Sequence, residues 1–402
     1  YSAYNLTKGE IPVKVPCRRV SGGFCILILL TLLCGCGNKA TTPTAAANGV
    51  DYNQYLNSPG YYACTDSAWY VCADNQIYFL DASLESPLRP LCAKADCNHN
   101  DPETCSSYLP SGAYNIYSWN DGLYYLRGSI EHGGIDVYQM GLDGQERKLL
   151  INYFSDDNNY SYTATGGGGF LAISWNRYTT NGDVSTLYLI SLDDYTTDPV
   201  VLFSNEDEVA AATPPAEVSQ PYVLCINQDW VFYSLTTGLE GKRSTALYGY
   251  QIATGETKLL IQEGFSLLGD LSQQGDTLYW YDTDGESYGA LNRIDLSSGE
   301  LSRVQEFSLA KSVWGTVDDR FLYLLGGEDS VKTKVGVYDL EGNELQRLSC
   351  AELGTPLGYA FSSADKVFFH SSALGEHAPI CWLDKDQLVN GKAAFHSIAS
   401  DN

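Results

Sequence analysis

Short hydrophobic runs, rich in aromatic and β-branched residues, recur throughout the sequence from residue 61 to residue 399. This composition is typical of β-strands, and each run is followed by a turn and a second run of the same kind. The runs are centred on residues 69, 123, 170, 231, 278, 322 and 367. The last four centres are about 45 residues apart, which is the repeat length of a four-stranded β-sheet unit. The longer intervals contain insertions at residues 93–109 and 205–218.

A second recurring element consists of a strand, a turn rich in Asp, Gly, Ser and Asn, and a last short strand. Its copies occupy residues 137–144, 187–194, 247–255, 291–299 and 335–342. Because Gly, Asn and Asp tolerate positive φ, these turns favour tight hairpins. No stretch of the repeat region has a convincing helical period.

The two elements together predict an all-β fold: a seven-bladed β-propeller of four-stranded antiparallel blades. A single four-stranded sheet cannot bury both of its faces, so the blades are expected to stack around an axis. The predicted blades are residues 61–92, 110–152, 160–204, 219–262, 266–307, 311–350 and 357–399. Six or eight blades, or two domains, stay open as alternatives because the first and third units are irregular. Each unit contains one Trp, which we expect to pack between blades, with sugar stacking by one or two of them as the alternative.

The first fifty residues predict export and membrane attachment. Lys14, Arg18 and Arg19 precede an apolar run at residues 24–34 that is too short to span a bilayer, the pattern of a secretory signal. The run ends in Leu33-Cys34-Gly35-Cys36, which resembles the lipobox of bacterial lipoproteins. The resemblance implies a diacylglycerol group on Cys36, so that the lipid bilayer is a partner and the chain lies on the outer face of the cell membrane. An ordinary secretory signal with incidental cysteines is the alternative.

These features divide the chain into three predicted parts. Residues 1–35 are a lipoprotein signal peptide, and residues 36–50 are the lipidated cysteine and a flexible tether. Residues 51–402 are the propeller domain, with a Cys/His insertion at residues 91–109.

Composition narrows the choice of partners. The chain has 49 acidic residues against 24 basic ones, a net charge of −25, so nucleic acid is not an expected partner. Hydrophobic residues make up 44% of the chain, which is too much for a disordered protein. We expect a monomer that binds an unknown extracellular ligand.

One local group of residues has the composition of a metal site. Cys92, Cys97, His99 and Cys105 lie within one short segment with the spacing Cys-x4-Cys-x-His-x5-Cys. Three thiols and an imidazole match a structural zinc site, and four protein ligands would leave no open position for catalysis. Thiols outside the membrane also tend to pair, so a disulfide between two of these cysteines, with the third bonded to Cys64 or Cys72, stays open beside the zinc site, as do free thiols.

The remaining cysteines and the acidic clusters do not form a comparable group of metal ligands. Cys64 and Cys72 flank a turn and could pair with each other, whereas Cys225, Cys350 and Cys381 are expected to be inert core residues. Asp282, Asp284 and Glu286 are similar to the start of a calcium loop, but the run lacks the Glu that an EF-hand has at its twelfth position. The other acidic clusters are at residues 156–159, 206–208 and 318–319. All are expected to be solvated loops that together could bind calcium weakly.

Two resemblances support the fold and the location. Leu278-Tyr279-Trp280-Tyr281-Asp282 resembles the Tyr-Trp-Thr-Asp repeat of receptor-type and TolB-like propellers, with Tyr281 at the usual position of Thr. The whole chain is similar to uncharacterised surface lipoproteins of Gram-positive bacteria that share the Cys-x4-Cys-x-His-x5-Cys segment. That family implies no function.

No motif predicts catalysis. The sequence lacks His-Glu-x-x-His, and the glycine run at residues 166–169 precedes a strand rather than a helix. His132, His370, His377 and His396 are scattered. We therefore expect a non-enzymatic binding or scaffolding module for a glycan, peptide or protein. The alternatives are a propeller enzyme acting on extracellular glycans or peptides, which would place two carboxylates about 5–10 Å apart, and an accessory subunit of an envelope sensor.

Overall fold

The computed structural model describes residues 60–101, 103–110, 113–129, 131–155, 159–211, 219–238, 244–262, 271–284, 288–308, 313–326, 334–371 and 378–399. The predicted signal peptide, the lipidation residue Cys36 and the tether lie outside these described residues. None of the helices in the described ranges has the length and hydrophobicity needed to cross a bilayer.

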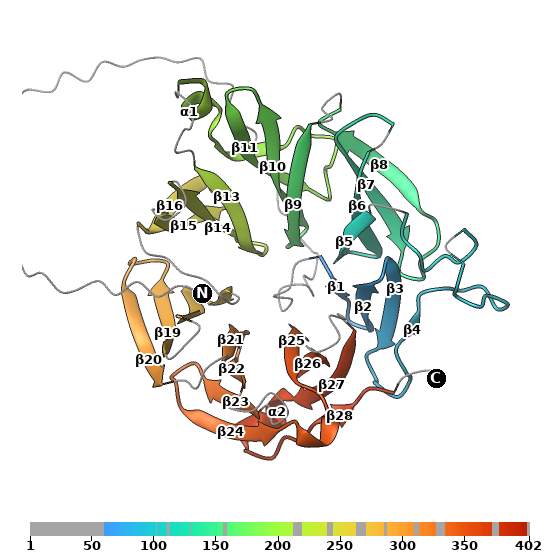
Figure 1. The fold of residues 1–402 in the computed structure, drawn as a ribbon, viewed down its shortest axis with the longest axis vertical. Coiled ribbons are helices and arrows are strands. Elements are labelled where there is room, and N and C mark those ends of the chain that lie inside the picture. Colours follow the sequence, from blue (N-terminus) through green and yellow to red (C-terminus); the bar gives the residue numbers. More distant parts are fainter. Residues whose placement is uncertain are drawn as a thin grey trace, which may run out of the picture. The chain divides into compact units, whose positions relative to one another are not determined.

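The described residues form seven four-stranded antiparallel sheets, which confirms the all-β propeller (Figure 1). Blade 1 contains β1 (Tyr62–Cys64), β2 (Ala68–Ala73), β3 (Gln76–Asp81) and β4 (Arg89–Pro90). Blade 2 contains β5 (Ala113–Trp119), β6 (Gly122–Gly128), β7 (Ile135–Gly141) and β8 (Lys148–Tyr153). Blade 3 contains β9 (Tyr160–Gly167), β10 (Phe170–Thr179), β11 (Gly182–Ser191) and β12 (Val200–Ser204). Blade 4 contains β13 (Gln220–Ile226), β14 (Trp230–Thr237), β15 (Ser244–Gln251) and β16 (Glu256–Ile261).

The last three blades follow the same plan. Blade 5 contains β17 (Leu271–Gln274), β18 (Thr277–Thr283), β19 (Tyr288–Asp295) and β20 (Leu301–Ser308). Blade 6 contains β21 (Trp314–Val317), β22 (Phe321–Gly326), β23 (Lys334–Asp339) and β24 (Glu344–Ser349). Blade 7 contains β25 (Leu357–Ser362), β26 (Lys366–Ser371), β27 (Pro379–Asp384) and β28 (His396–Ser397). Two short helices, α1 (Glu206–Ala211) and α2 (Lys385–Val389), and a 3-10 turn (Ala351–Leu353) accompany the strands.

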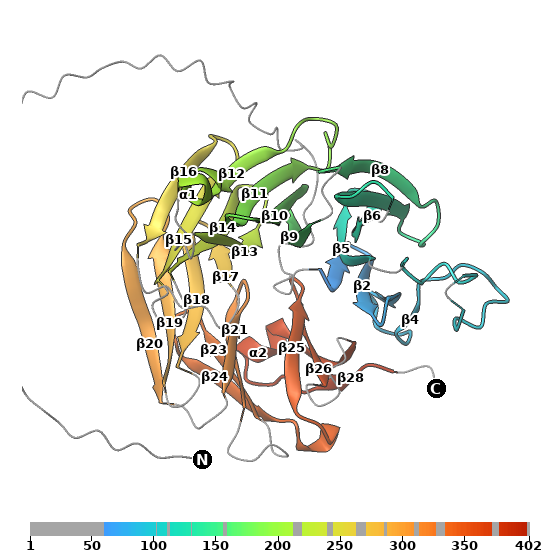
Figure 2. The same cartoon turned by 45° about the horizontal axis from the view of Figure 1, so that its top comes forward.

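Each blade is built from four strands that are consecutive in the sequence and paired in sequence order. The first strand of a blade lies toward the centre of the ring and the last toward the rim, so the chain crosses outward through one blade and returns to the centre to begin the next (Figures 1 and 2). The seven observed blades coincide with the seven predicted units, and the alternatives of six or eight blades are wrong.

The hydrophobic core is divided into seven clusters, one between each pair of neighbouring blades. The cluster that closes the ring joins blade 7 to blade 1, where the rings of Tyr62 and Phe361 are 4.7 Å apart and those of Trp69 and Phe368 are 4.8 Å apart. Because each described sheet contains strands of one blade only, apolar packing closes the ring, without a strand shared between the two ends of the repeat region.

The tryptophans mostly follow the packing prediction. Five tryptophans are buried, namely Trp69, Trp119, Trp175, Trp230 and Trp280. Trp382 is partly buried and packs against the cluster between blades 7 and 1. The prediction is wrong for Trp314, which begins β21 with 60% of its surface exposed.

The glycine run at residues 166–169 has a packing role. It forms the tight hairpin between β9 and β10, and Gly169 has a φ of +82°. A Cβ atom on Gly169 would lie only 2.6 Å from Cζ2 of Trp119 in blade 2. Glycine is therefore required here both by the backbone and by the close approach of the neighbouring blade.

Candidate functional site

The four residues of the predicted metal site do come together. The potential ligand atoms of Cys92, Cys97, His99 and Cys105 all lie within 4.8 Å of one another. Cys105 Sγ is 3.5 Å from His99 Nδ1. In a tetrahedral zinc site with Zn–S distances of 2.3 Å, two sulfur ligands are about 3.8 Å apart, so a contraction of about 1 Å at most would complete the site. The cluster could therefore bind a metal such as zinc.

The loop that carries the cluster connects β4 to β5 and is held by both neighbouring blades. From blade 1, Gln76 Nε2 donates to the carbonyl of His99 at 3.3 Å and to Ser107 Oγ at 2.8 Å. From blade 2, the guanidinium of Arg147 donates to the carbonyls of Tyr108 and Ser106. In Figure 1 this loop lies at the rim of the ring, beside blades 1 and 2.

The backbone of His99 is held in an uncommon conformation. Its φ is +55°, in the left-handed region that residues other than glycine seldom adopt. The carbonyl of His99 accepts hydrogen bonds from Gln76 and Tyr108, which stabilise this conformation and direct the imidazole toward Cys105. A backbone held in this way is a frequent property of ligand-holding positions.

One thiol of the cluster, that of Cys92, ionises more readily than an ordinary cysteine. Burial raises the pKa of the Cys92 thiol, but hydrogen bonds from Ser106 and from the backbone amides of Lys94 and Ser106 outweigh that effect and lower it to about 6. A thiol that ionises this readily is suited to metal coordination, because the thiolate is the ligand form.

None of the eight cysteines in the described residues is part of a disulfide. The predicted pairing of Cys64 with Cys72 is wrong, because the two side chains point to opposite faces of blade 1. Cys64 is opposite Trp69 and packs with it toward blade 7, whereas Cys72 packs toward blade 2. Cys350 and Cys381 are core residues as expected, and burial raises the pKa values of their thiols to about 11 and about 12.

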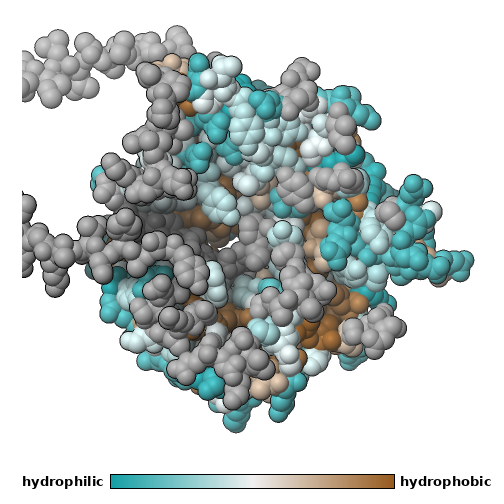
Figure 3. Space-filling model, in the orientation of Figure 1, coloured by the Kyte–Doolittle hydropathy of each residue, from teal (hydrophilic) through white to brown (hydrophobic). Residues whose placement is uncertain are grey.

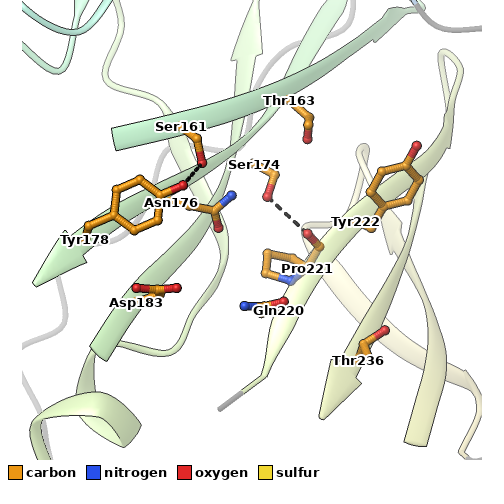
Figure 4. Close-up of a pocket in the computed structure, with 10 residues that line it drawn as sticks. All are labelled: Ser161, Thr163, Ser174, Asn176, Tyr178, Asp183, Gln220, Pro221, Tyr222 and Thr236. Atoms are coloured by element: carbon orange, nitrogen blue, oxygen red, sulfur yellow. Dashed lines mark hydrogen bonds between the residues drawn. The ribbon is translucent and has the colours of Figure 1, made fainter. Parts of the chain in front are cut away.

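The structure contains a second candidate site that the sequence analysis did not find. A cleft with a cavity volume of about 310 Å³ lies between blades 3 and 4 (Figure 4). It is lined by ten residues from β9, β10, β11, β13 and β14, namely Ser161, Thr163, Ser174, Asn176, Tyr178, Asp183, Gln220, Pro221, Tyr222 and Thr236. Nine of the ten carry a polar group, and Asp183 is the one charged side chain among them.

Some polar groups of the cleft hold its walls, and others are available to a ligand. Ser174 Oγ donates to the carbonyl of Pro221 at 3.0 Å and thereby ties blade 3 to blade 4. Tyr178 OH donates to Ser161 Oγ at 2.7 Å. In contrast, the side chains of Thr163, Asp183 and Gln220 make no hydrogen bond within the described part of the chain.

No sequence motif marks this cleft, because its lining residues are distributed over residues 161–236. The one feature of the sequence that could have indicated the cleft is the presence of polar residues in otherwise apolar strands. Ser174 and Asn176 alternate with Trp175 on β10, and Asn176 is directed toward the cleft while Trp175 packs in the core.

The prediction that residues 318–319 form a solvated loop is wrong. Asp318 is 1% exposed and forms an ion pair of 2.8 Å with Lys385, whose side chain is fully buried at the start of α2. Lys385 also pairs with Asp319 at 2.5 Å. These residues join blade 6 to blade 7 and belong to the structural framework.

The other predicted polar sites remain dispersed or fall partly outside the described residues. Within the described ranges, the Cys/His group is the one set of three or more such side chains that converges on a metal-sized space. Glu286 and His377 lie outside those ranges, as does most of the cluster at residues 156–159. Residues 206–208 begin helix α1 rather than a loop, and Glu206 pairs with Arg177 at 2.8 Å.

The comparisons with known proteins show a likeness of fold and no more. The structure is similar to puromycin hydrolase, with a TM-score of 0.50 and 12% identity over 87% of this chain and 55% of the hydrolase. It is similar to prolyl oligopeptidase B from Galerina marginata, with a TM-score of 0.50 and 10% identity over 87% of this chain and 53% of that protein. TolB from Acinetobacter baumannii has a TM-score of 0.33 and 12% identity over 77% of this chain and 64% of TolB.

The two likenesses with a TM-score of 0.50 agree with the fold that the seven sheets define. The chain spans about half the length of the hydrolase and the oligopeptidase, and at these identities the likeness extends to the fold alone. Comparison with protein-family models and with curated protein sequences gives no match.

Proposed function

We propose that this protein is a lipid-anchored extracellular propeller that binds a ligand without catalysing its conversion. The cleft between blades 3 and 4 carries this proposal, because it offers a concave polar surface on two rigid sheets. The lipobox-like segment at Cys36 supports attachment to the membrane, and the acidic composition supports a soluble, displayed domain.

The composition of the cleft favours binding over catalysis. Glycoside hydrolysis requires two carboxyl groups that flank the scissile bond. Asp183 is the single carboxylate among the ten lining residues, and the lining contains no His, Cys or Lys. The cleft therefore has groups for recognition, but it lacks an acid–base pair.

The proposal is tested with purified residues 51–402, a segment that contains all seven interblade clusters. The protein is applied to glycan and peptide arrays, and each positive is incubated with the protein and analysed by mass spectrometry. We expect a bound ligand that is recovered unchanged. Turnover of the ligand would refute the non-catalytic proposal, and the absence of any bound class would refute the binding function.

We also propose that the Cys/His cluster binds a structural zinc ion that fixes the loop against blades 1 and 2. The four ligand types, their convergence and the hydrogen bonds from Gln76 and Arg147 support this proposal. Four protein ligands would complete the coordination of zinc, so the ion would stabilise the loop and would take no part in a reaction. Calcium binding by the acidic loops stays a prediction.

Metal content and thiol titration distinguish zinc from a disulfide. We expect one zinc per chain in the protein as purified, and its loss in Cys105→Ser. The matched control is Cys225→Ser, which makes the same chemical change outside the cluster and should keep the zinc. A metal-free wild-type protein that has lost two of the thiols of residues 92, 97 and 105 would show that the loop is closed by a disulfide.

A further inference from the structure

The chemistry of the cleft between blades 3 and 4 restricts the class of ligand that it can accept. None of its ten lining residues is a Lys, Arg or His, and Asp183 contributes a negative charge. Phosphate, sulfate and carboxylate groups require a cationic or helix N-terminal partner to offset their desolvation. A ligand that binds among these residues therefore carries no negative charge at the point of contact.

The polar groups of the cleft match a ligand with many hydroxyls. Asn176 Oδ1 accepts a hydrogen bond of 2.7 Å from Ser185, which fixes the orientation of the amide. Figure 4 shows the amide nitrogen of Asn176 directed away from Asp183, toward the open space beside Ser174. Gln220 and Thr163 offer a further amide and hydroxyl, and the Asp183 carboxylate offers strong acceptors. Sugar hydroxyls donate and accept, so they can pair with all of these groups at once.

Two tyrosine rings supply the apolar part of the recognition surface. Tyr178 of β10 is 43% exposed and Tyr222 of β13 is 54% exposed. Figure 4 shows them on opposite sides of the cleft, one on each blade. Exposed aromatic rings provide a rigid contact surface at small entropic cost, and the C–H faces of a sugar ring can lie against them.

The size of the cleft agrees with a small unit of a larger molecule. Its volume of about 310 Å³ is at the lower end of the range for ligand pockets. Such a volume accommodates one or two sugar rings, and the open mouth allows the remainder of a chain to extend outward. A protein partner would need a much larger contact surface.

We propose that the cleft binds one or two uncharged sugar units of an extracellular glycan, with Tyr178 and Tyr222 as contact surfaces for the rings. Asn176, Asp183 and Gln220 are the groups that fix the orientation of the sugar through its hydroxyls. This inference rests on the proposed binding function and names the ligand class and the residues for it.

The test uses purified residues 51–402 on an array of neutral, acidic and amine-bearing oligosaccharides, with a peptide array in parallel. A neutral oligosaccharide that binds is then titrated by calorimetry into the wild-type protein and four variants, and the affinities are compared. Tyr222→Ala and Asp183→Ala are each expected to weaken binding about tenfold or more, because each removes one main contact. Tyr61→Ala is the matched control, since Tyr61 is 44% exposed and lies in blade 1, away from the cleft. Asn176→Ala is the fourth variant and should weaken binding; because it also removes the acceptor of the buried Ser185 hydroxyl, its unfolding temperature is measured alongside.

The outcomes separate the inference from the function on which it rests. Binding of a neutral glycan that the cleft variants do not weaken would overturn this site, although the protein would still be a binding module. Binding of acidic glycans alone, of amine-bearing glycans alone or of peptides alone would overturn the ligand class. A protein that binds no member of either array would overturn the proposed function itself.

Discussion

The buried ion pair between blades 6 and 7 gives a sharp test of how the ring is held together. Asp318 Oδ1 accepts hydrogen bonds of 2.8 Å from the backbone amides of Arg320 and Phe321. Its Oδ2 accepts from Tyr323 OH at 2.9 Å, from Ser362 Oγ at 2.5 Å and from the Lys385 ammonium at 2.8 Å. The side chains of Asp318 and Lys385 are both 0% exposed, so solvent does not screen their interaction.

The perturbation is Lys385→Met, which keeps the length of the side chain and removes its charge. The variant leaves Asp318 ionised and buried without its cation, which costs about 3–5 kcal/mol in comparable cases. Four hydrogen bonds to the carboxylate remain, so we expect about 3 kcal/mol, the lower end of that range. The assay is urea denaturation, monitored by tryptophan fluorescence. The free energies of unfolding are compared between variants whose free energy has the same dependence on urea concentration.

A matched control and a double variant isolate the charge effect. Arg303→Met removes a cation from an ion pair in which both side chains are mostly exposed, and it should cause no measurable change. Asp318→Asn combined with Lys385→Met should recover part of the loss, because the fully buried carboxylate is gone and the partly exposed Asp319 is the one acid left without its cation. A Lys385→Met variant as stable as the control would refute the reasoning.

The same ion pair predicts a dependence on pH. Burial opposes the ionisation of Asp318, but the Lys385 ammonium and the hydrogen bonds outweigh it and hold the pKa of Asp318 below its ordinary value of 3.8. A carboxyl group whose pKa is lowered by folding contributes stability above its unfolded pKa and loses it as the pH falls through the folded pKa. The stability difference between wild type and Lys385→Met should therefore shrink as the pH is lowered below about 4. A difference that stays constant from pH 7 to pH 2 would contradict this assignment.

Three further predictions concern packing and location. Gly169→Ala should destabilise the protein by about 2 kcal/mol or more in the same urea assay, because the new methyl group clashes with Trp119 and the backbone is strained. Gly299→Ala is the control and should cost clearly less, because Gly299 also has a positive φ, +75°, but a methyl group there would have no atom within 4 Å. Trp280→Ala should cost about 3–5 kcal/mol and Trp314→Ala about 0.5 kcal/mol or less, and equal losses would contradict the assigned burial. Cys36→Ser should move the full chain from the membrane fraction to the soluble fraction of a bacterial host and abolish labelling by palmitate; retention in the membrane would refute lipid anchoring.

The repeat architecture could be predicted from the sequence because it depends on local patterns that are repeated seven times. A hairpin of β-branched and aromatic residues with a Gly or Asp turn specifies its own register, and an error in one unit is corrected by the others. The Cys/His group could be predicted for a similar reason, because its four ligand residues are close in the sequence. The first three of the four are partly exposed, and the loop needs little long-range information to bring them together.

Burial of individual polar residues could not be predicted, because it depends on the neighbouring blade. Asp318 and Asp319 look alike in the sequence, yet Asp318 is 1% exposed and receives five hydrogen bonds. Its partner Lys385 follows it by more than sixty residues, and Ser362 comes from yet another strand. A run of two acids is usually solvated, and the local pattern contains nothing that identifies the exception.

The cleft between blades 3 and 4 shows how a repeat fold creates a site that no repeat contains. The cleft lies where the Ser174 hydroxyl of β10 bonds across to the carbonyl of Pro221 in β13. One of the seven apolar clusters packs blade 3 against blade 4 beside this gap. Side chains at the ends of five strands line it, and these positions carry no structural requirement for hydrophobicity. Strand ends beside an interblade gap are therefore where such a propeller can change its specificity at the smallest cost in stability.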